Sequence, residues 1–305
     1  MPPNSNIPTC KVLPLELQHP AVIELIELSL VEDLSPRATV DSFSQYLATG
    51  DVTSAATLDE TQTLKGQITA KSSGIVAGLP VAEAVFKRVD AAINFEAVVS
   101  DGLKVQSGQV LATISGLGRA ILTAERPALN FLGRLSGIAT LTHRYVDAVI
   151  DTGTVILDTR KTAPGFRLLD KYAVRQGGGT NHRMGLFDMA LIKDNHIDAA
   201  GSVSNAIQKV RNAYGTKIPI EVEVKDLEEL QTALTLLVDR IMLDNMPPEM
   251  IRKAVKISNG RVPLEVSGNV NLETVRAIAK TGVDFISVGA ITHSAPNFDV
   301  SLRLS

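Results

Sequence analysis

Three groups of side chains in the second half of the chain have the types and spacing to bind an anionic substrate. The cationic group comprises Arg160, Lys161, His182, Arg183 and Lys193. The acidic group is the pair Glu223 and Asp244. The small neutral group comprises Ser267, Gly268, Asn269, Gly289 and Ala290. Any one of these residues could be an ordinary loop residue or helix cap, but together they follow six successive strand-like runs.

Each group suits a different part of a polyanionic ligand. The planar guanidinium of arginine binds carboxylates in pairs, so the cationic group predicts an acid with more than one carboxylate or phosphate. Two carboxylates on neighbouring strands could hold Mg²⁺, which takes a few protein oxygens together with substrate phosphate. Small residues after a strand let backbone N–H groups approach a phosphate. The sequence therefore predicts a site for a polyanionic acid, a magnesium diphosphate and a terminal phosphate.

The glycine-rich segment 177–183 (GGGTNHR) has two interpretations. It is either a flexible connector or a loop that tightens on the ligand and presents His182 and Arg183. No Gly-Lys-Ser/Thr follows it, so it is not a nucleotide P-loop. The chain also lacks a Gly-x-Ser-x-Gly elbow and a His-Glu-x-x-His motif. His182 and His196 lack metal-ligand spacing, and each is expected to be a hydrogen-bonding residue.

Strands and helices alternate where these groups occur. Strand-like runs are expected at 155–158, 189–192, 218–224, 240–243, 262–266 and 285–288. Helices are expected between most of them, at 204–214, 227–237, 248–258 and 272–281, whereas the first gap holds the glycine-rich loop. Strands separated by helices form a parallel sheet. The periodicity alone leaves open whether that sheet closes into a barrel or stays doubly wound, with its chemistry at the strand ends in either case.

The first part of the chain has a different pattern, with helices expected at 20–33, 80–89 and 120–150 and short strands at 64–70, 74–77, 95–99 and 109–114. The stretch 99–116 is similar to the hairpin of biotinyl and lipoyl carrier domains, which would make Lys104 the attachment site. Lys104 does not fall at the tip of a tight turn, however. A small sandwich domain is therefore the favoured interpretation.

Composition argues against several classes of protein. The 30 Lys and Arg residues balance 33 Asp and Glu residues, which gives no support for a nucleic-acid or membrane-surface partner. No apolar run approaches the ~20 residues needed to cross a bilayer. The start, 1–11, holds three prolines and no long apolar core, unlike a secretory signal. Cys10 is the only cysteine and is interpreted as a bystander, so a cytoplasmic protein is expected.

Several long blocks resemble the quinolinate phosphoribosyltransferase family, the decarboxylating nicotinate-nucleotide pyrophosphorylases. They are 123–126 (TAER), 128–130 (ALN), 135–140 (LSGIAT) and 158–165 (DTRKTAPG), followed in order by 177–183, 191–197, 221–224, 242–246, 267–269 and 287–290. The resemblance covers most of the chain from Ile23 onward. It implies transfer of a phosphoribosyl group from phosphoribosyl pyrophosphate to quinolinate with loss of CO2, giving nicotinate mononucleotide and pyrophosphate in NAD biosynthesis.

The resemblance also implies a role for each site residue. The residues that would bind quinolinate are Arg160, His182, Arg183 and Lys193. Those that would hold phosphoribosyl pyrophosphate and its Mg²⁺, and act in catalysis, are Lys161, Glu223 and Asp244. Those that would bind the 5′-phosphate are Ser267, Gly268 and Gly289. Arg126 would come from the neighbouring subunit of a homodimer with shared active sites, and assembly beyond the dimer is left open.

The implied fold is α/β, with an amino-terminal α/β-sandwich domain followed by an incomplete six-stranded α/β barrel. The expected boundaries are 1–130 for the first domain, with the tail 291–305 returning to it, and 131–290 for the barrel. The segment 35–49 is expected to be an insertion before the family's Gly-Asp-Val-Thr motif at 50–53. Two rivals remain. Quinolinate-dependent CO2 release would exclude a related phosphoribosyltransferase for another heteroaromatic acid. A non-catalytic carrier module predicts a biotinyl or lipoyl mass increment on Lys104.

Overall fold

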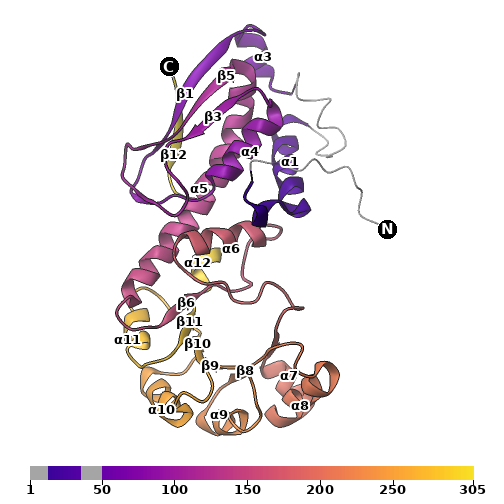
Figure 1. Cartoon of the computed structure of the whole chain (residues 1–305), viewed down its shortest axis with the longest axis vertical. Helices are drawn as coiled ribbons and strands as arrows, with labels where there is room; N and C mark the ends of the chain where they lie inside the picture. The colour runs from indigo at the N-terminus through magenta and orange to yellow at the C-terminus, as the bar shows by residue number, and fades with distance from the viewer. Residues whose placement is uncertain (1–12, 36–49) are drawn as a thin grey trace. The chain divides into compact units, whose positions relative to one another are not determined.

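The computed structural model describes residues 13–35 and 50–305, which divide into two compact units (Figure 1). The first unit contains the described part of 1–141 together with 163–177 and 295–305. The second contains 142–162 and 178–294. Cys10 and the expected insertion, apart from Ser35, lie outside the described residues.

This division differs from the expected boundary at residue 130. That position falls inside α5 (Gly118–Val149), a continuous helix that tolerates Pro127 in its interior. Residues 131–141 and 163–177 belong to the first unit, and the returning tail starts at 295 instead of 291. One physical reason is a double hydrogen bond between Arg134 of α5 and Asp170 of α6 (Arg167–Gln176), a long-range contact that local periodicity does not reveal.

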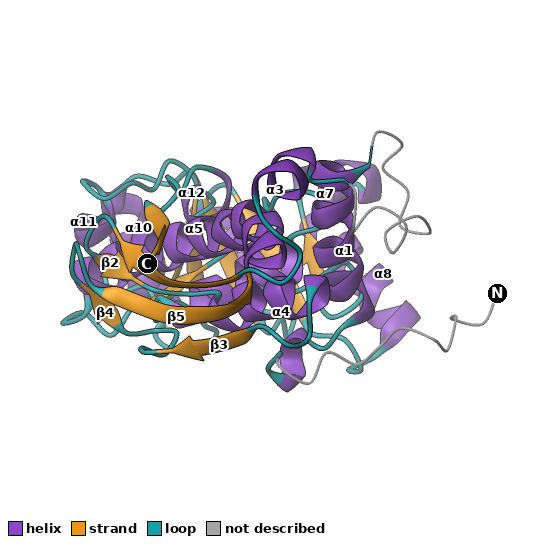
Figure 2. Ribbon diagram, turned by 90° about the horizontal axis from the view of Figure 1, so that it is seen from above, coloured by secondary structure: helices purple, strands orange, loops and turns teal. Residues whose placement is uncertain are grey.

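The first unit is built on a four-stranded antiparallel sheet with the order β12-β1-β5-β3 (Figures 1 and 2). Its strands are β12 (Val300–Leu304), β1 (Thr63–Ala70), β5 (Val110–Leu117) and β3 (Asn94–Ala97). The sheet includes the end of the chain, because β12 pairs with β1 in the register Ala70↔Val300. The return of the last residues to the first domain is therefore observed.

Helices cover this sheet with apolar side chains. Among the described residues before α5, the helices and helical turns are η1 (Leu15–Leu17), α1 (Pro20–Leu34), α3 (Val52–Thr57) and α4 (Leu79–Val89). On α1 the buried residues Val22, Ile23, Ile26 and Leu30 recur at helical spacing, as expected. The start of α4 is held by the Asp101 carboxylate, which accepts the N–H groups of Gly78 at 2.6 Å and Leu79 at 3.1 Å.

Two short strands form a separate small sheet in the first unit. They are β2 (Gly74–Ile75) and β4 (Lys104–Val105), paired in the register Ile75↔Lys104. Lys104 thus lies in a paired strand and not at the tip of a hairpin, where a carrier domain presents its modified lysine. The sandwich interpretation therefore holds over the carrier interpretation.

The second unit contains six parallel strands in the order β6-β11-β10-β9-β8-β7. They are β6 (Val155–Leu157), β7 (Ala190–Ile192), β8 (Ile220–Val224), β9 (Arg240–Asp244), β10 (Leu264–Ser267) and β11 (Phe285–Ser287). Strands that follow one another in the sequence are neighbours in this order, except that β6 and β7 lie at opposite edges and do not pair. We call the gap between them the cut; the sheet is the incomplete barrel that the resemblance implies. Thr180 makes one isolated parallel bridge to Leu157 beside the cut.

The helices of the second unit lie outside the strands (Figure 1). They are α7 (Asp194–Ala200), α8 (Val203–Tyr214), α9 (Leu227–Ala233), α10 (Pro248–Ser258), α11 (Val275–Ala279) and α12 (Ala290–His293). α9 and α11 are shorter than expected. The chain after α9 reaches a left-handed backbone at Leu237, with φ of 50°, and Asn271 accepts the N–H of Thr274 in a turn before α11.

Alternate residues of the strands point into the barrel in layers. Glu221 and Glu223 of β8 are two positions apart and share the inward face, whereas Val222 and Val224 are buried on the other face. The same alternation puts Glu265 below Ser267 on β10. The strand patterns therefore predict one acidic layer in the interior and a second polar layer at the rim.

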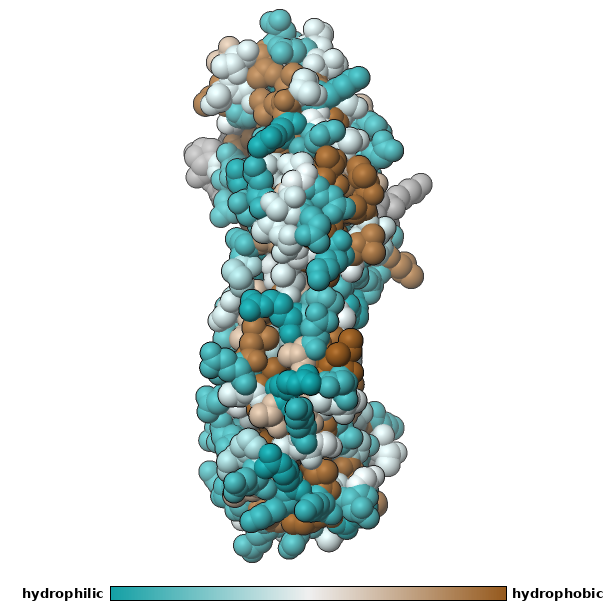
Figure 3. All heavy atoms as spheres, turned by 90° about the vertical axis from the view of Figure 1, so that its left-hand side faces the viewer, coloured by the Kyte–Doolittle hydropathy of each residue, from teal (hydrophilic) through white to brown (hydrophobic). Residues whose placement is uncertain are grey.

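Hydrophilic and apolar side chains are interspersed over the face of the molecule shown in Figure 3. Within the described ranges, no helix combines the length and the apolar character that crossing a membrane requires.

The Arg134–Asp170 pair is expected to stabilise the first unit strongly. Asp170 is fully buried, and burial raises the pKa of its carboxyl despite the Arg134 guanidinium. Arg134→Met should lower the free energy of unfolding by about 3 kcal/mol, because it leaves a buried carboxylate without its counter-ion. Urea denaturation provides the measurement. Arg276→Met is the matched control, since Arg276 makes an equally bidentate but exposed pair with Asp151.

The control substitution should cost much less, because exposed ion pairs contribute little to stability. Equal losses in the two variants would contradict the role of burial.

Candidate active site

A pocket of about 720 Å³ lies at the carboxyl ends of the second unit's strands. Every predicted site residue in that unit lines it, namely Arg160, Lys161, His182, Arg183, Lys193, Glu223, Asp244, Ser267, Gly268 and Gly289. Asn269 and Ala290 of the small neutral group line it too. Arg126 is exposed on α5 in the first unit and is not among these lining residues. The structure thus brings three chemically different groups together in one cavity.

Backbone hydrogen bonds hold the loops that carry the lysines. The N–H of Lys161 donates to Thr159 Oγ1 at 3.1 Å, and its carbonyl accepts the Thr292 hydroxyl at 2.9 Å. The N–H of Lys193 donates to His196 Nδ1 at 2.9 Å at the start of α7. His196 therefore caps a helix, as expected for a hydrogen-bonding histidine, and its ring nitrogen positions the backbone of Lys193.

The two arginines of the pocket lie near enough to repel each other. Burial, together with the positive charge of Arg160, lowers the pKa of Arg183 below its ordinary value, although an arginine stays charged at neutral pH. Arg183 also donates to the carbonyl of Met189 at 3.0 Å, which holds its guanidinium in place. A bound anion would relieve the repulsion between the two guanidinium groups, so the protein is preorganised for a ligand of negative charge.

Lys193 and Glu223 form an ion pair across neighbouring strand ends, with Nζ and Oε2 at 2.8 Å. According to the resemblance, these two residues bind different ligands. Lys193 would bind quinolinate, and Glu223 would bind Mg²⁺. In the structure they neutralise each other, and each must change partner for both ligands to bind as predicted.

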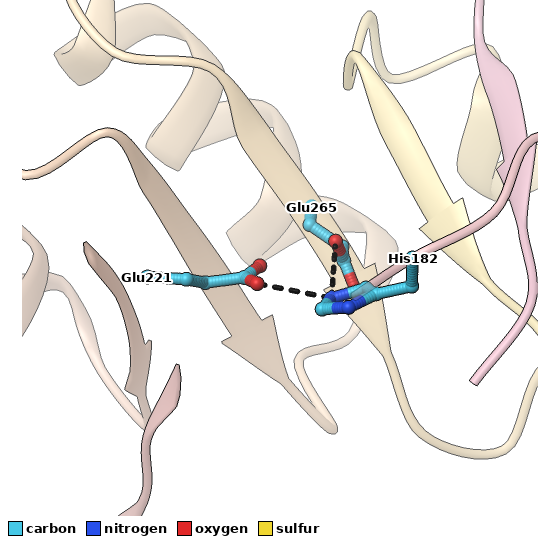
Figure 4. A group of neighbouring side chains, drawn as sticks. All are labelled: His182, Glu221 and Glu265. Carbon is cyan, nitrogen blue, oxygen red and sulfur yellow. Dashed lines mark ion pairs between the residues drawn. The ribbon is translucent and has the colours of Figure 1, made fainter. Parts of the chain in front are cut away.

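Beneath the pocket lies a buried cluster of His182, Glu221 and Glu265 (Figure 4). The Nε2 atom of His182 is 3.0 Å from Glu221 Oε2 and 3.4 Å from Glu265 Oε2. Arg240 donates to Glu265 at 2.9 Å, and the Ser287 hydroxyl donates to the same carboxylate. Both glutamates are fully buried, so the positive charges of Arg240 and His182 are their compensation.

Charge decides the protonation state of His182. Burial lowers its pKa, but the carboxylates of Glu221 and Glu265 outweigh burial and raise the pKa to about 9. The Arg183 N–H lies 2.7 Å from Nδ1, a contact that suits a neutral ring. Burial raises the pKa of Glu221, whereas the pKa of Glu265 is lowered by His182, Ser287 and Arg240 despite its burial. The negative charge of this pair outweighs one amide dipole, so we assign the imidazolium form at neutral pH. An imidazolium has no lone pair for a metal, and the cluster is therefore a buried ionic network despite its metal-like composition.

Neither Glu221 nor Glu265 was assigned a role from the sequence. The alternating pattern of β8 and β10 is the signal that points both residues into the barrel.

Other residues of the pocket were not identified from the sequence. Leu191, Met242 and His293 line the pocket without having been predicted. A Cβ placed on Gly289 would lie 3.2 Å from both the His293 ring and Lys161 Cδ, so these side chains crowd the glycine. The spacing of Gly289 and His293, one helical turn apart at α12, is the signal that could have identified the histidine.

The ionic network predicts a pH-dependent contribution to stability. Because the folded-state pKa of His182 lies above the ordinary value of 6.5, its contribution is complete below pH 6.5 and is lost as the pH rises through about 9. His182→Gln should cost about 3 kcal/mol at low pH and progressively less in alkaline solution. Denaturant unfolding across the pH range measures the difference from wild type. His143→Gln, at a partly exposed histidine of α5 outside the network, is the control and should show little difference. A pH-independent loss in His182→Gln would contradict the imidazolium assignment.

Comparison with known proteins gives the same family for both parts of the chain. Residues 138–303 match the family described as quinolinate phosphoribosyl transferase, C-terminal domain, and residues 51–136 match its N-terminal domain. The chain is 46% identical over 274 residues to the chloroplastic nicotinate-nucleotide pyrophosphorylase [carboxylating] of Arabidopsis thaliana, covering 84% of this chain and 78% of the relative. It is 43% identical over 263 residues to the probable nicotinate-nucleotide pyrophosphorylase [carboxylating] of Bacillus subtilis, covering 86% and 91%.

A solved structure agrees with these relatives. The nicotinate-nucleotide pyrophosphorylase from Francisella tularensis superposes with a TM-score of 0.85 at 43% identity, covering 92% of this chain and 95% of that one. Both domain matches occur in the order of the family, and the relatives extend over most of the chain. The protein therefore belongs to the quinolinate phosphoribosyltransferase family.

Proposed function

We propose that this protein transfers the phosphoribosyl group of phosphoribosyl pyrophosphate to quinolinate and releases CO2, forming nicotinate mononucleotide and pyrophosphate for NAD biosynthesis. The observation that carries the proposal is the pocket itself, which unites cationic, acidic and small neutral groups in one cavity. Each group matches one part of the two substrates. The names of the relatives in Arabidopsis and Bacillus describe the same type of enzyme.

The reaction requires no protein nucleophile. The ring nitrogen of quinolinate attacks the anomeric carbon, a new N–C bond forms, and the bond to the diphosphate oxygen breaks. The ring nitrogen is then cationic and accepts the electron pair left when the adjacent carboxylate departs as CO2. A proton from solvent replaces the carboxylate on the ring carbon. Positioning and charge stabilisation account for most of the catalysis, so the absence of a catalytic triad motif from the sequence is no objection.

The cationic side of the pocket binds and orients quinolinate. Arg160, Arg183 and Lys193 face the carboxylates, and the repulsion between the arginines favours a ligand with two negative charges. Leu191 and Met242 line the same cavity and supply apolar contact. A less polar environment favours decarboxylation, because the reaction removes the opposite charges of the ring nitrogen and the departing carboxylate.

The acidic pair suits Mg²⁺. Glu223 and Asp244 offer hard carboxylate oxygens from adjacent strands of one pocket, and such oxygens are the ligands that Mg²⁺ prefers. Bound there with the diphosphate, Mg²⁺ would neutralise the charge that builds up on the leaving group. Lys161 adds a positive charge to the same stabilisation. Gly268 and Gly289 line the same pocket, where small residues let backbone N–H groups approach the 5′-phosphate.

The proposal includes a homodimer in which Arg126 of one subunit completes the site of the other. Two observations support it. Arg126 is exposed, and it belongs to the TAER block, one of the blocks on which the resemblance to the family rests. A cytoplasmic location is also proposed, supported by the balanced charge and the single cysteine, and cell fractionation tests it.

Substrate choice tests the proposed function. Quinolinate should be used about ten- to a hundredfold better than nicotinate, because nicotinate lacks one charge-assisted carboxylate contact. The assay supplies phosphoribosyl pyrophosphate and Mg²⁺ with either acid and measures pyrophosphate from both and CO2 from quinolinate. Equal use of the two acids, or preference for nicotinate, would identify a related phosphoribosyltransferase with another substrate.

Mixed dimers test the shared site. Arg126→Ala and Lys193→Ala should each be nearly inactive alone, since every site of such a homodimer lacks one cation. In a mixed dimer, one site lacks both side chains and the other site has both. Refolding the two variants together should restore activity toward one good site in each mixed dimer, whereas mixing after refolding should restore less. Mass spectrometry counts the mixed dimers, and their inactivity would place Arg126 outside the shared site.

A further inference from the structure

Two asparagines follow neighbouring strands of the pocket in an uncommon backbone conformation. Asn245 comes directly after β9 and has φ of 52°, and Asn269 comes shortly after β10 and also has φ of 52°. Gly268 between Ser267 and Asn269 has φ of 98°. Left-handed backbone is uncommon outside glycine, and asparagine is among the few residues that enter it at low cost. Such conformations concentrate where a structure holds a functional group in a set position.

The two side chains form one hydrogen-bonded chain that ends on Asp244. The Asn245 Nδ2 atom donates to Asp244 Oδ2 at 2.8 Å, and Asn269 Nδ2 donates to Asn245 Oδ1 at 3.1 Å. An ionised carboxylate only accepts hydrogen bonds, so the nitrogen of the Asn245 amide must face Asp244. Its oxygen then faces Asn269. The network therefore determines the orientation of both amides.

Backbone geometry keeps this chain in place. The N–H of Asn245 donates to the carbonyl of Ser267 at 2.9 Å, which continues the pairing of β9 with β10 beyond the strand end. The Asn245 amide also lies against Gly268, where an added Cβ would collide with Oδ1. Gly268 thus has a second role besides approach to a phosphate, because it leaves the space that the Asn245 amide occupies.

We propose that Asn245 is a positioning residue that aims the Asp244 carboxylate at the metal–diphosphate, with Asn269 holding the Asn245 amide in its orientation. This inference rests on the proposed function, in which Asp244 holds Mg²⁺. The Asn245 amide donates to Oδ2 of that carboxylate, which leaves Oδ1 as the oxygen available to the cation. Residues that orient a metal ligand change metal affinity without touching the metal.

Asn245→Gly is the direct test, because glycine keeps the left-handed backbone without strain and removes only the amide. The readout is equilibrium binding of phosphoribosyl pyrophosphate at increasing Mg²⁺ concentration, without quinolinate. The Mg²⁺ concentration for half-maximal binding should rise about tenfold. The KM for phosphoribosyl pyrophosphate should rise as well, whereas quinolinate binding should stay unchanged. Asn269→Gly should shift the Mg²⁺ requirement in the same direction but less.

Asn259→Gly is the matched control. Asn259 is also an asparagine in left-handed backbone, with φ of 48°, but it ends α10 and does not line the pocket. This variant should keep the wild-type Mg²⁺ requirement, and its melting temperature shows what the same substitution does to stability alone. A Mg²⁺ shift of equal size in Asn259→Gly would overturn the inference.

Asp244→Asn separates this inference from the proposed function. If Asp244→Asn raises the Mg²⁺ requirement and Asn245→Gly does not, the positioning role is wrong and the metal site stands. If neither substitution changes the requirement, the assignment of Mg²⁺ to Asp244 is wrong, and the positioning role falls with it.

Discussion

Parallel pairing of six strands is the constraint on which the site depends. In a parallel sheet all strands point the same way, so residues that follow different strands meet at one edge. Arg160, Lys193, Asp244 and Ser267 are far apart in sequence and reach one pocket for this reason. The cut between β6 and β7 leaves the cationic loops on either side of the opening, since Arg160 follows β6 and Lys193 follows β7.

Buried carboxylates one layer below the rim offset the repulsion between the cations of the pocket. Arg160 and Arg183 raise the positive potential of the pocket, and the buried carboxylates of Glu221 and Glu265 supply negative charge beneath it. Those carboxylates are themselves balanced by Arg240 and by protonated His182. Positive and negative charges therefore alternate from the pocket into the barrel interior. The buried layer does not touch the ligand, but its charges stabilise the cations that bind it.

Local pattern predicted most strands and helices of the second unit, and the longer sequence blocks indicated the family and its barrel. Neither predicted all the features that depend on distant contacts. The strands and the charged residues after them are visible because burial imposes alternation, as in Glu221 to Val224, and because loops carry polar residues. The hydrogen bonds between Arg134 and Asp170 join segments with no common local pattern, and the observed division into units differs there from the expected boundary. The charge state of His182 likewise depends on glutamates from two other strands. The roles of the site residues stay predictions.

The edge strand β12 has a consequence for how the chain folds during synthesis. Residues 300–304 hydrogen-bond to residues 66–70, so the sheet of the first unit gains its last strand only after the whole barrel has been translated. Until then β1 presents an unpaired edge, which is open to pairing with another nascent chain. The second unit lies between the parts of the first unit in the sequence and is interrupted only by residues 163–177. It can complete its own sheet earlier. Closure of the first sheet therefore follows translation of the second unit.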